Sequence, residues 1–458
     1  MRKIALISLI LAGLSLQAFA KKDALVFRAK GVASELKMPD GTMVEYTAYT
    51  DIYYVTNVKD SSLQKLNFFV PKCATQKSAI LLRTYVGGYM AARASTPRAD
   101  DATGRALAEG MCVCIPGSRG INSQSADGAY TGTAPNGLID LKAAVRYLRY
   151  NDKKMPGSAE RIITDGTSAG GAMSALLGAT ANHPDYEPYL KAAGAAKAKD
   201  DVYASVCYCP ITDLDHADEA YEWLYMNQRA DHDAAFAHAL KFDAYINSLN
   251  LRNPKTGERL TSDNYIEYMK SYLVASASRF VAEGGEIPDS LGFQYETVYP
   301  SVPKSRPGGR RLVRARGQRS GQIVDVDLDQ YLSYVVGRQT LKPSPAFDNL
   351  QSPESRLFSD AQGAPVRFTG PGLSSDVQQR VRLMNPMNYI TDGRARKATF
   401  WYIRHGALDR DTSFPVPINL ATLLMNEGKK VDFALPWNRG HQGDYNLDDL
   451  FRWLHSIL

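Results

Sequence analysis

Residues 161–179, RIITDGTSAGGAMSALLGA, decide the expected fold of this chain. A β-branched apolar run comes first, a small-residue helix follows, and GTSAG (166–170) lies between them. A Gly-x-Ser-x-Gly sequence between a strand and a helix is typical of a sharp turn that lifts the serine hydroxyl clear of a sheet. The glycines relieve crowding there, and the helix directs its N-terminal dipole at the serine. Ser168 is therefore the candidate nucleophile; the alternative is a glycine-rich turn that only packs a strand against a helix.

Strand-like and helix-like segments alternate on both sides of this turn. Apolar strand-like runs occur at 78–88, 111–120, 201–213, 398–406 and 430–437. Apolar side chains recur at helical spacing at 137–151, 417–428 and 446–458. Segments that alternate like antiparallel strands come earlier, at 24–29, 44–56 and 65–71. This order predicts an α/β fold with a mixed, mostly parallel sheet.

The alternation breaks between residues 214 and 394, which look helical at first and then irregular and rich in Pro, Gly and Ser. We therefore expect a core in two parts, 21–213 and 395–458, with an inserted cap domain at 214–394. Within the cap, residues 304–319 carry seven basic side chains. A solvated loop is the favoured interpretation, and a patch for acidic polymers or a membrane surface is the alternative.

Residues 1–20 have a basic start, an apolar run and a final Ala-Phe-Ala, which is the layout of a cleavable signal peptide. We expect a secreted or periplasmic protein without stable membrane association. The chain has 54 Lys and Arg against 48 Asp and Glu, a net charge of +6. That excess is too mild to indicate a nucleic-acid partner.

A serine nucleophile needs a base and an acid, and in α/β hydrolases these follow it in the order acid, then histidine. His441 fits the base because PWNRGHQGDY comes directly after an apolar strand. Two aspartates fit the acid, because Asp409 and Asp411 both lie in the loop HGALDRDTSF after the preceding strand. His405 precedes both and ends its own strand, so we interpret it as a hydrogen-bonded structural histidine.

The oxyanion formed on an attacked carbonyl needs N–H donors. The amide after the nucleophile, that of Ala169, is one candidate, and Gly87 or Gly88 in TYVGGYM supplies the other. Together these parts specify acyl transfer to water, by an esterase or a peptidase. The sequence has no phosphate-binding loop, dinucleotide fingerprint or zinc-hydrolase motif, so no cofactor and no metal are expected.

The chain resembles the bacterial tannases (tannin acyl hydrolases), α/β hydrolases with a large inserted lid that cleave galloyl esters. The resemblance covers nearly all of the chain after residue 20. Its most specific stretches are TYVGGYM, LKAAVRYLRYN, RIITDGTSAGGAMSALLGA, LDHADEAYEW, SPAFDNLQSPESRLF, YIRHGALDRDTSFPVPI and VDFALPWNRGHQGDYNLDDLFRW.

The resemblance assigns a role to each matching position. It makes Ser168 the nucleophile, Asp409 the acid and His441 the base, and it places the oxyanion at the amides of Gly88 and Ala169. It implies that the three hydroxyls of a galloyl ring contact three side chains, those of Lys342, Glu354 and Asp411. Such a substrate presents O–H donors, so carboxylates suit it as acceptors and a lysine can donate to a phenolic oxygen.

The preferred interpretation is thus an exported serine esterase that hydrolyses galloyl esters, and possibly depsides, of tannins to release gallate. A feruloyl or other hydroxycinnamoyl esterase with the same triad is the nearest alternative. A catalytically inactive carbohydrate- or polyphenol-binding protein on this fold, and a peptidase, are the others. The expected partners are small-molecule esters.

The five cysteines are Cys73, Cys112, Cys114, Cys207 and Cys209. Cys112 and Cys114 are two residues apart in one strand-like run, and Cys207 and Cys209 are two residues apart in another, so each pair faces one side of its strand. A zinc site or a bridge between the two pairs is therefore conceivable. In the expected sheet, however, the strand of Cys112 and that of Cys207 lie three strand spacings apart, about 14 Å. A disulfide needs Cα atoms within roughly 7 Å. We therefore predict buried thiols without a bridge or zinc site between the pairs.

Overall fold

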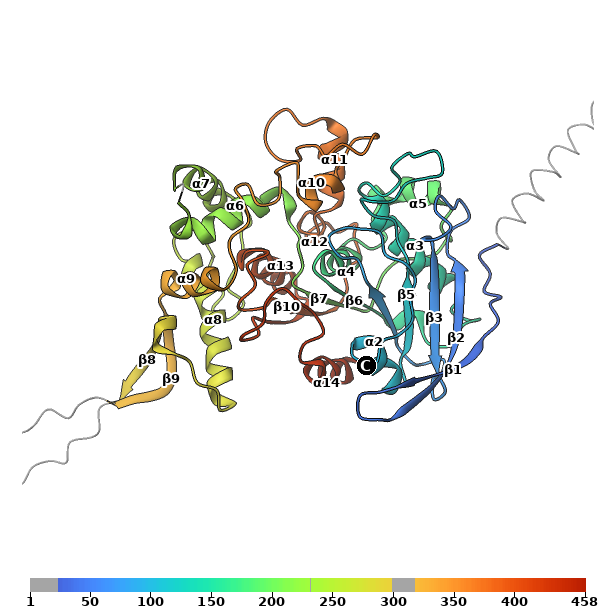
Figure 1. Cartoon of the computed structure of the whole chain (residues 1–458), viewed down its shortest axis with the longest axis horizontal. Helices are drawn as coiled ribbons and strands as arrows, with labels where there is room; N and C mark the ends of the chain where they lie inside the picture. The colour runs from blue at the N-terminus through green and yellow to red at the C-terminus, as the bar shows by residue number, and fades with distance from the viewer. Residues whose placement is uncertain (1–23, 231, 299–317) are drawn as a thin grey trace, which may run out of the picture.

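The computed structural model describes residues 24–230, 232–298 and 318–458 (Figure 1). The segment interpreted as a signal peptide and most of the basic run at 304–319 lie outside these residues. Among the described residues, no helix is both long and apolar enough to cross a membrane.

The core is a nine-stranded sheet in the order β1-β2-β3-β5-β4-β6-β7-β10-β11. The strands are β1 (Val32–Lys37), β2 (Met43–Tyr53), β3 (Lys65–Pro71), β4 (Ile80–Thr84), β5 (Cys112–Pro116), β6 (Ile162–Thr167), β7 (Ala204–Tyr208), β10 (Phe400–Arg404) and β11 (Lys430–Ala434). The pairs β1–β2, β2–β3 and β3–β5 are antiparallel and the remaining pairs are parallel. The predicted mixed, mostly parallel α/β sheet is confirmed.

Helices cover both faces of this sheet. One face packs against α2 (Ala102–Ala108) and α14 (Leu447–Ile457), through a cluster that includes Leu81 and Phe451. The other face packs against α3 (Asn136–Tyr150), α4 (Ala169–Ala179) and α13 (Pro415–Asn426), through a second cluster that includes Leu82. Neighbouring residues Leu81 and Leu82 point to opposite layers because side chains alternate along a strand. A short helix, α5 (Glu187–Ala193), packs beside α3.

The N-terminal segment differs from the prediction. Residues 24–29 form no strand in the structure, and the first strand begins at Val32. The Asn151 side chain binds this segment instead: its Oδ1 accepts from the N–H of Phe27 at 2.8 Å, and its Nδ2 donates to the carbonyl of Leu25 at 2.9 Å. Since a side chain satisfies these backbone groups, the apolar alternation at 24–29 reflects packing against the core.

The segment between β7 and β10 contains most of the remaining elements. They are α6 (Leu214–Tyr225), α7 (His232–Ser248), α8 (Tyr265–Ala282), β8 (Phe293–Val298), β9 (Gln318–Val326), α9 (Leu328–Arg338), α10 (Pro353–Leu357), α11 (Ser375–Leu383) and α12 (Met387–Ile390). This segment also contains single-turn 3₁₀ helices at Met226–Gln228 and Asp289–Leu291. Two others, at Ala159–Arg161 and Pro184–Tyr186, lie before β7. In Figure 1, α6 to α9 gather beside β10, at the end of the sheet away from β1 to β3.

The second half of this segment is more regular than the sequence suggested. We expected irregular chain, whereas the structure has an antiparallel β8–β9 hairpin and helices α9 to α11. Each of these helices begins at a side-chain N-cap: Asp327 accepts from Gln330 N–H, Ser352 from Ser355 N–H, and Ser374 from Val377 N–H. Capping compensates for weak apolar periodicity in short helices.

The predicted separation of the cysteine pairs is confirmed. β4 and β6 lie between β5, which carries Cys112 and Cys114, and β7, which carries Cys207. All five cysteines fall within the described ranges and are free thiols.

Candidate active site

Ser168 occupies a strained turn between β6 and α4. Its backbone has φ +61° and ψ −124°, a region that residues with a Cβ rarely adopt. A Cβ on Gly166 would lie 2.2 Å from the carbonyl oxygen of Gly170, and one on Gly170 would lie 2.8 Å from that of Thr84. Only glycine fits at both positions, so the sequence around Ser168 permits a turn that exposes its hydroxyl at the carboxyl end of β6.

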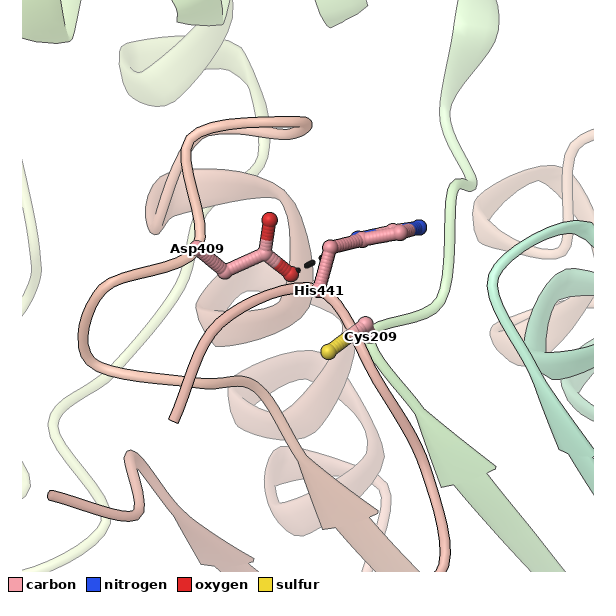
Figure 2. Close-up of side chains that lie close together, drawn as sticks. All are labelled: Cys209, Asp409 and His441. Carbon is pink, nitrogen blue, oxygen red and sulfur yellow. Dashed lines mark hydrogen bonds and ion pairs between the residues drawn. The ribbon is translucent and has the colours of Figure 1, made fainter. Parts of the chain in front are cut away.

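His441 and Asp409 extend a hydrogen-bonded chain from this serine. His441 Nε2 lies 2.8 Å from Ser168 Oγ. Its Nδ1 lies 2.8 Å from Asp409 Oδ2, the contact drawn as a dashed line in Figure 2. The backbone N–H of Asp411 donates to the other carboxylate oxygen of Asp409 at 2.9 Å. His441 follows β11 and Asp409 follows β10, so loops at neighbouring strand ends hold the two side chains together.

The charges in this chain stabilise one another. Burial alone would raise the pKa of Asp409, but His405 and the hydrogen bond from His441 lower it to about 2. Burial opposes protonation of His441, whereas the hydrogen bond to Asp409 and its charge raise the pKa of the imidazole above its ordinary value. A fully buried carboxylate thus stays ionised and favours the imidazolium that would form during proton transfer.

The two candidate oxyanion donors lie on adjoining elements. Ala169 is the first residue of α4, so its N–H has no partner within the helix. Gly88 follows β4 with φ +53°, in a loop that packs against the start of α4: the carbonyl oxygen of Val86 lies 2.9 Å from an ideal Cβ on Gly170. The structure therefore brings the β4 loop to the helix terminus beside Ser168.

Lys342, Glu354 and Asp411 form a charged group beside the candidate triad. Burial lowers the pKa of Lys342, and the charges of Glu354 and Asp411 oppose that shift. Burial raises the pKa of Glu354, which is 4% exposed, and the charge of Lys342 opposes it. Asp411 pairs with Arg410 at 3.0 Å, and Lys342 Nζ lies 4.2 Å from the centre of the Phe347 ring. The N–H of Asp411 donates to Asp409, and the charges of Asp411 and Lys342 act on the pKa of His441, so these two residues lie near the candidate triad.

Comparison with known proteins gives concordant matches. A family model described as BD-FAE matches residues 66–269. The solved structure of Fusobacterium nucleatum tannase is 33% identical, with a TM-score of 0.83, over 94% of this chain and 99% of that chain. A tannin acyl hydrolase from Lactobacillus plantarum is 34% identical, with a TM-score of 0.82, over 95% and 99% of the two chains. This chain belongs to the bacterial tannase family.

Two further matches are to a tannin acyl hydrolase and, over a short stretch, to an esterase. A tannin acyl hydrolase solved in complex with ethyl gallate is also 34% identical, with a TM-score of 0.82, over 95% of this chain and 99% of that chain. Over 56 residues the chain is 43% identical to Esterase LipC of Mycobacterium tuberculosis, a match to 14% of that protein's length and 12% of this chain. The tannase-family chain is a carboxylic ester hydrolase with an α/β-hydrolase fold.

Helix α6 fixes the cap segment that carries Lys342 and Glu354 in this tannase-family chain. The Asp218 carboxylate accepts the N–H groups of Phe347 and Asp348, at 2.7 and 2.9 Å. The Tyr221 hydroxyl accepts the N–H of Lys342 at 3.2 Å. Sequence reasoning assigned no role to Asp218 or Tyr221, although their i, i+3 spacing on a helix places them on one face.

A buried arginine fixes the loop that carries His441. Arg83 Nη1 donates to Asp165 at 2.5 Å, and the same guanidinium donates to both carboxylate oxygens of Asp444, at 2.9 and 2.5 Å. Asp165 lies three residues before Ser168 and Asp444 three residues after His441. The bridge joins the segments that carry Ser168 and His441 of the candidate triad, and no sequence motif pointed to it.

Cys209 and His405 both lie against Asp409, and the second of them was misjudged from the sequence. The sulfur of Cys209, a carboxylate oxygen of Asp409 and a ring nitrogen of His441 all lie within 4.8 Å of one another (Figure 2). His405 is fully buried and its Nδ1 lies 3.5 Å from Asp409 Oδ2. The prediction that His405 is hydrogen-bonded is wrong: neither ring nitrogen makes a hydrogen bond of normal geometry within the described residues.

A second cluster of titratable groups, Asp213, Asp215 and His216, is saturated by internal contacts. Asn385 Nδ2 donates to both Asp213 and Asp215, at 2.7 and 2.6 Å, and the Tyr245 hydroxyl donates to Asp213 at 2.8 Å. The His216 ring stacks on Tyr245 with centroids 3.6 Å apart. These contacts join the start of α6 to α7 and to the chain before α12, which is a structural role.

Proposed function

We propose that this chain hydrolyses galloyl esters through an acyl-enzyme on Ser168. The observation that carries the proposal is the chain of 2.8 Å contacts from Ser168 to His441 to Asp409, set beside the charged group of Lys342, Glu354 and Asp411, of which Glu354 is buried and the other two are partly exposed. The first set suits acyl transfer, and the second suits a ring that bears several hydroxyls.

In the proposed first step, His441 Nε2 accepts the Ser168 hydroxyl proton while Oγ attacks the ester carbonyl carbon. The oxyanion faces the amides of Gly88 and Ala169, donors that are each worth roughly 3 kcal/mol of barrier. Collapse of the tetrahedral intermediate expels the alcohol, which takes the proton from His441. Water then attacks the acyl-enzyme by the same route and releases gallate.

The proposed ring contacts follow from hydrogen-bond chemistry. Glu354 and Asp411 accept phenolic O–H groups, while Lys342 donates to a phenolic oxygen and offsets the repulsion between the two carboxylates. A ring without these hydroxyls would leave buried polar groups unpaired, a penalty of roughly 10⁴-fold in kcat/KM.

We propose that the chain is organised as a core in two segments with an inserted cap. Core segments 21–213 and 395–458 supply the triad and the oxyanion donors, and cap segment 214–394 supplies Lys342 and Glu354. Residues 1–20 are proposed to direct export as a cleaved signal peptide. N-terminal sequencing of the secreted protein, with a first residue at position 21, tests that proposal.

A panel of methyl esters that differ only in ring hydroxylation tests the substrate. We expect the kcat/KM for methyl gallate to exceed that for methyl benzoate by about 10⁴-fold, with the dihydroxy ester between them. A clear preference for methyl ferulate would instead favour a hydroxycinnamoyl esterase. Turnover by Ser168→Ala equal to that of the wild type would overturn the acyl-enzyme mechanism itself.

A further inference from the structure

The Cys209 thiol and the His405 imidazole lie beside Asp409 and His441 of the proposed triad. Cys209 and Asp409 are fully buried, and the side chain of His441 is 19% exposed. The Cys209 backbone N–H donates to the carbonyl of Arg404, the residue before His405, at 2.7 Å. Pairing of β7 with β10 therefore fixes Cys209 beside the loop that carries Asp409.

The donor atoms of this group are those that bind thiophilic divalent cations. Zn²⁺ and Cd²⁺ favour thiolate, imidazole and carboxylate ligands in tetrahedral sites. The sulfur of Cys209, a carboxylate oxygen of Asp409 and a ring nitrogen of His441 lie within 4.8 Å of one another, and Figure 2 shows all three side chains converging.

His405 gives an independent indication of an incomplete site. It is fully buried, its two ring nitrogens make no hydrogen bond of normal geometry to any described residue, and its Nδ1 lies 3.5 Å from Asp409 Oδ2. Buried polar groups without partners are costly and uncommon in folded proteins. His405 therefore borders the carboxylate of the group, while the donor atoms that lie within 4.8 Å of one another are those of Cys209, Asp409 and His441.

We propose that Zn²⁺ or Cd²⁺ binds to Cys209, Asp409 and His441 and switches the enzyme off. The ion replaces the proton on Cys209 Sγ, which leaves to solvent, and takes the lone pair of His441 Nδ1. The ring proton of His441 then resides on Nε2. The resulting Nε2–H cannot accept the Ser168 proton, so the base is lost; this consequence rests on the proposed triad.

Charge balance favours the ion in this buried position. A thiolate and a carboxylate together neutralise a dication, whereas the ion-free site holds the Asp409 charge alone. In the ion-free site the Cys209 thiol donates to the carbonyl of Gln442, with the sulfur 3.4 Å from that oxygen, and the ion would replace this proton. Mg²⁺ and Ca²⁺ prefer six or more oxygen ligands and are not expected to inhibit. Because only His441 is partly exposed, its ring must move to admit the ion, and inhibition should develop slowly.

The test compares wild type, Cys209→Ser and Cys73→Ser. Cys73 is exposed and lies far from these side chains in the fold, on the turn after β3, so Cys73→Ser is the matched thiol control. After preincubation with Cd²⁺ or Zn²⁺, hydrolysis of methyl gallate is measured relative to each protein's own metal-free rate. We expect equal inhibition of wild type and Cys73→Ser, and a half-inhibitory concentration at least about tenfold higher for Cys209→Ser, which lacks the soft ligand.

A binding readout separates this inference from the proposed function. Cd²⁺ bound to a thiolate gives a charge-transfer absorption in the ultraviolet, which needs no turnover. We expect this band in Cys73→Ser and in Cys73→Ser with Ser168→Ala, and its loss when Cys209→Ser or Cys209→Ala is added. Equal metal sensitivity of Cys209→Ser and wild type, or no band in Cys73→Ser, would overturn the site. If the enzyme fails to cleave methyl gallate, the band alone decides the inference.

Discussion

The proposed triad is built from loops at strand ends, whereas the proposed ring-binding side is built largely on the segment between α9 and α10, which contacts α6. Ser168, His441 and Asp409 hydrogen-bond directly to one another, and the strands before them are parallel neighbours or near neighbours in the sheet. The N–H of Lys342 donates to Tyr221 and that of Phe347 to Asp218, both on α6, while Glu354 lies on α10, which begins at the N-cap Ser352. In the proposed function, chemistry thus belongs to the core and recognition to the cap, with Asp411 as the one proposed ring contact on a core loop.

The largest effect is expected from Ser168→Ala, which removes the proposed nucleophile and leaves the proposed ring contacts in place. Ser168→Ala should lower kcat for methyl gallate by about 10⁶-fold, because the acyl-enzyme cannot form. The ring contacts remain, so the variant should bind gallate with the Kd of the wild type, measured by calorimetry. A large loss of gallate affinity would mean that the two sides are not separable.

A smaller effect should follow from weakening the hydrogen bonds by which Asp218 holds Phe347 and Asp348. Asp218→Asn replaces an acceptor of two N–H groups by an amide whose NH₂ faces one of them, a loss of roughly 1 to 3 kcal/mol. We expect KM for methyl gallate to rise about tenfold or more while kcat/KM for methyl benzoate stays the same. Asp329→Asn, at an exposed cap carboxylate that bonds Asn227, is the matched control and should change neither. Equal losses on both esters would show that Asp218 stabilises the overall fold and has no specific role in binding the galloyl ring.

The smallest effect concerns pH. His441 must be neutral to accept a proton, and its pKa lies above its ordinary value because Asp409 outweighs burial. The kcat/KM of the wild type should therefore fall as pH drops through a value above 6.5. In Asp409→Asn the residual activity should show its inflection at lower pH. An inflection at the same pH in both proteins would show that Asp409 does not raise the pKa of His441.

The triad order could be predicted because loops at the carboxyl ends of parallel strands meet at one edge of the sheet. Ser168 and His441 each follow an apolar strand, so sequence position was enough to propose them. Asp409 and Asp411 could not be separated from the residues alone, because both lie in the same loop and differ only in where each side chain points. The family resemblance separated them.

The surroundings of Asp409 could not be predicted, because they depend on which strands pair. β7 and β10 are adjacent in the sheet but separated in sequence by the whole cap segment, so nothing local places Cys209 beside Asp409 and His405. The Arg83–Asp444 bridge spans even more of the chain. In the cap, N-cap residues such as Asp327 and Ser374 were the readable signal for helices that apolar periodicity did not reveal.

The most direct measurement of the division between chemistry and recognition compares Asp409→Asn with Asp411→Asn on methyl gallate and methyl benzoate. Asp409→Asn should lower kcat by about 10⁴-fold on both esters, since the imidazole loses its orienting carboxylate. Asp411→Asn should lower kcat/KM for methyl gallate and leave methyl benzoate nearly unchanged. If Asp411→Asn lowered both rates equally, or if Asp409→Asn affected methyl gallate alone, the account would be contradicted.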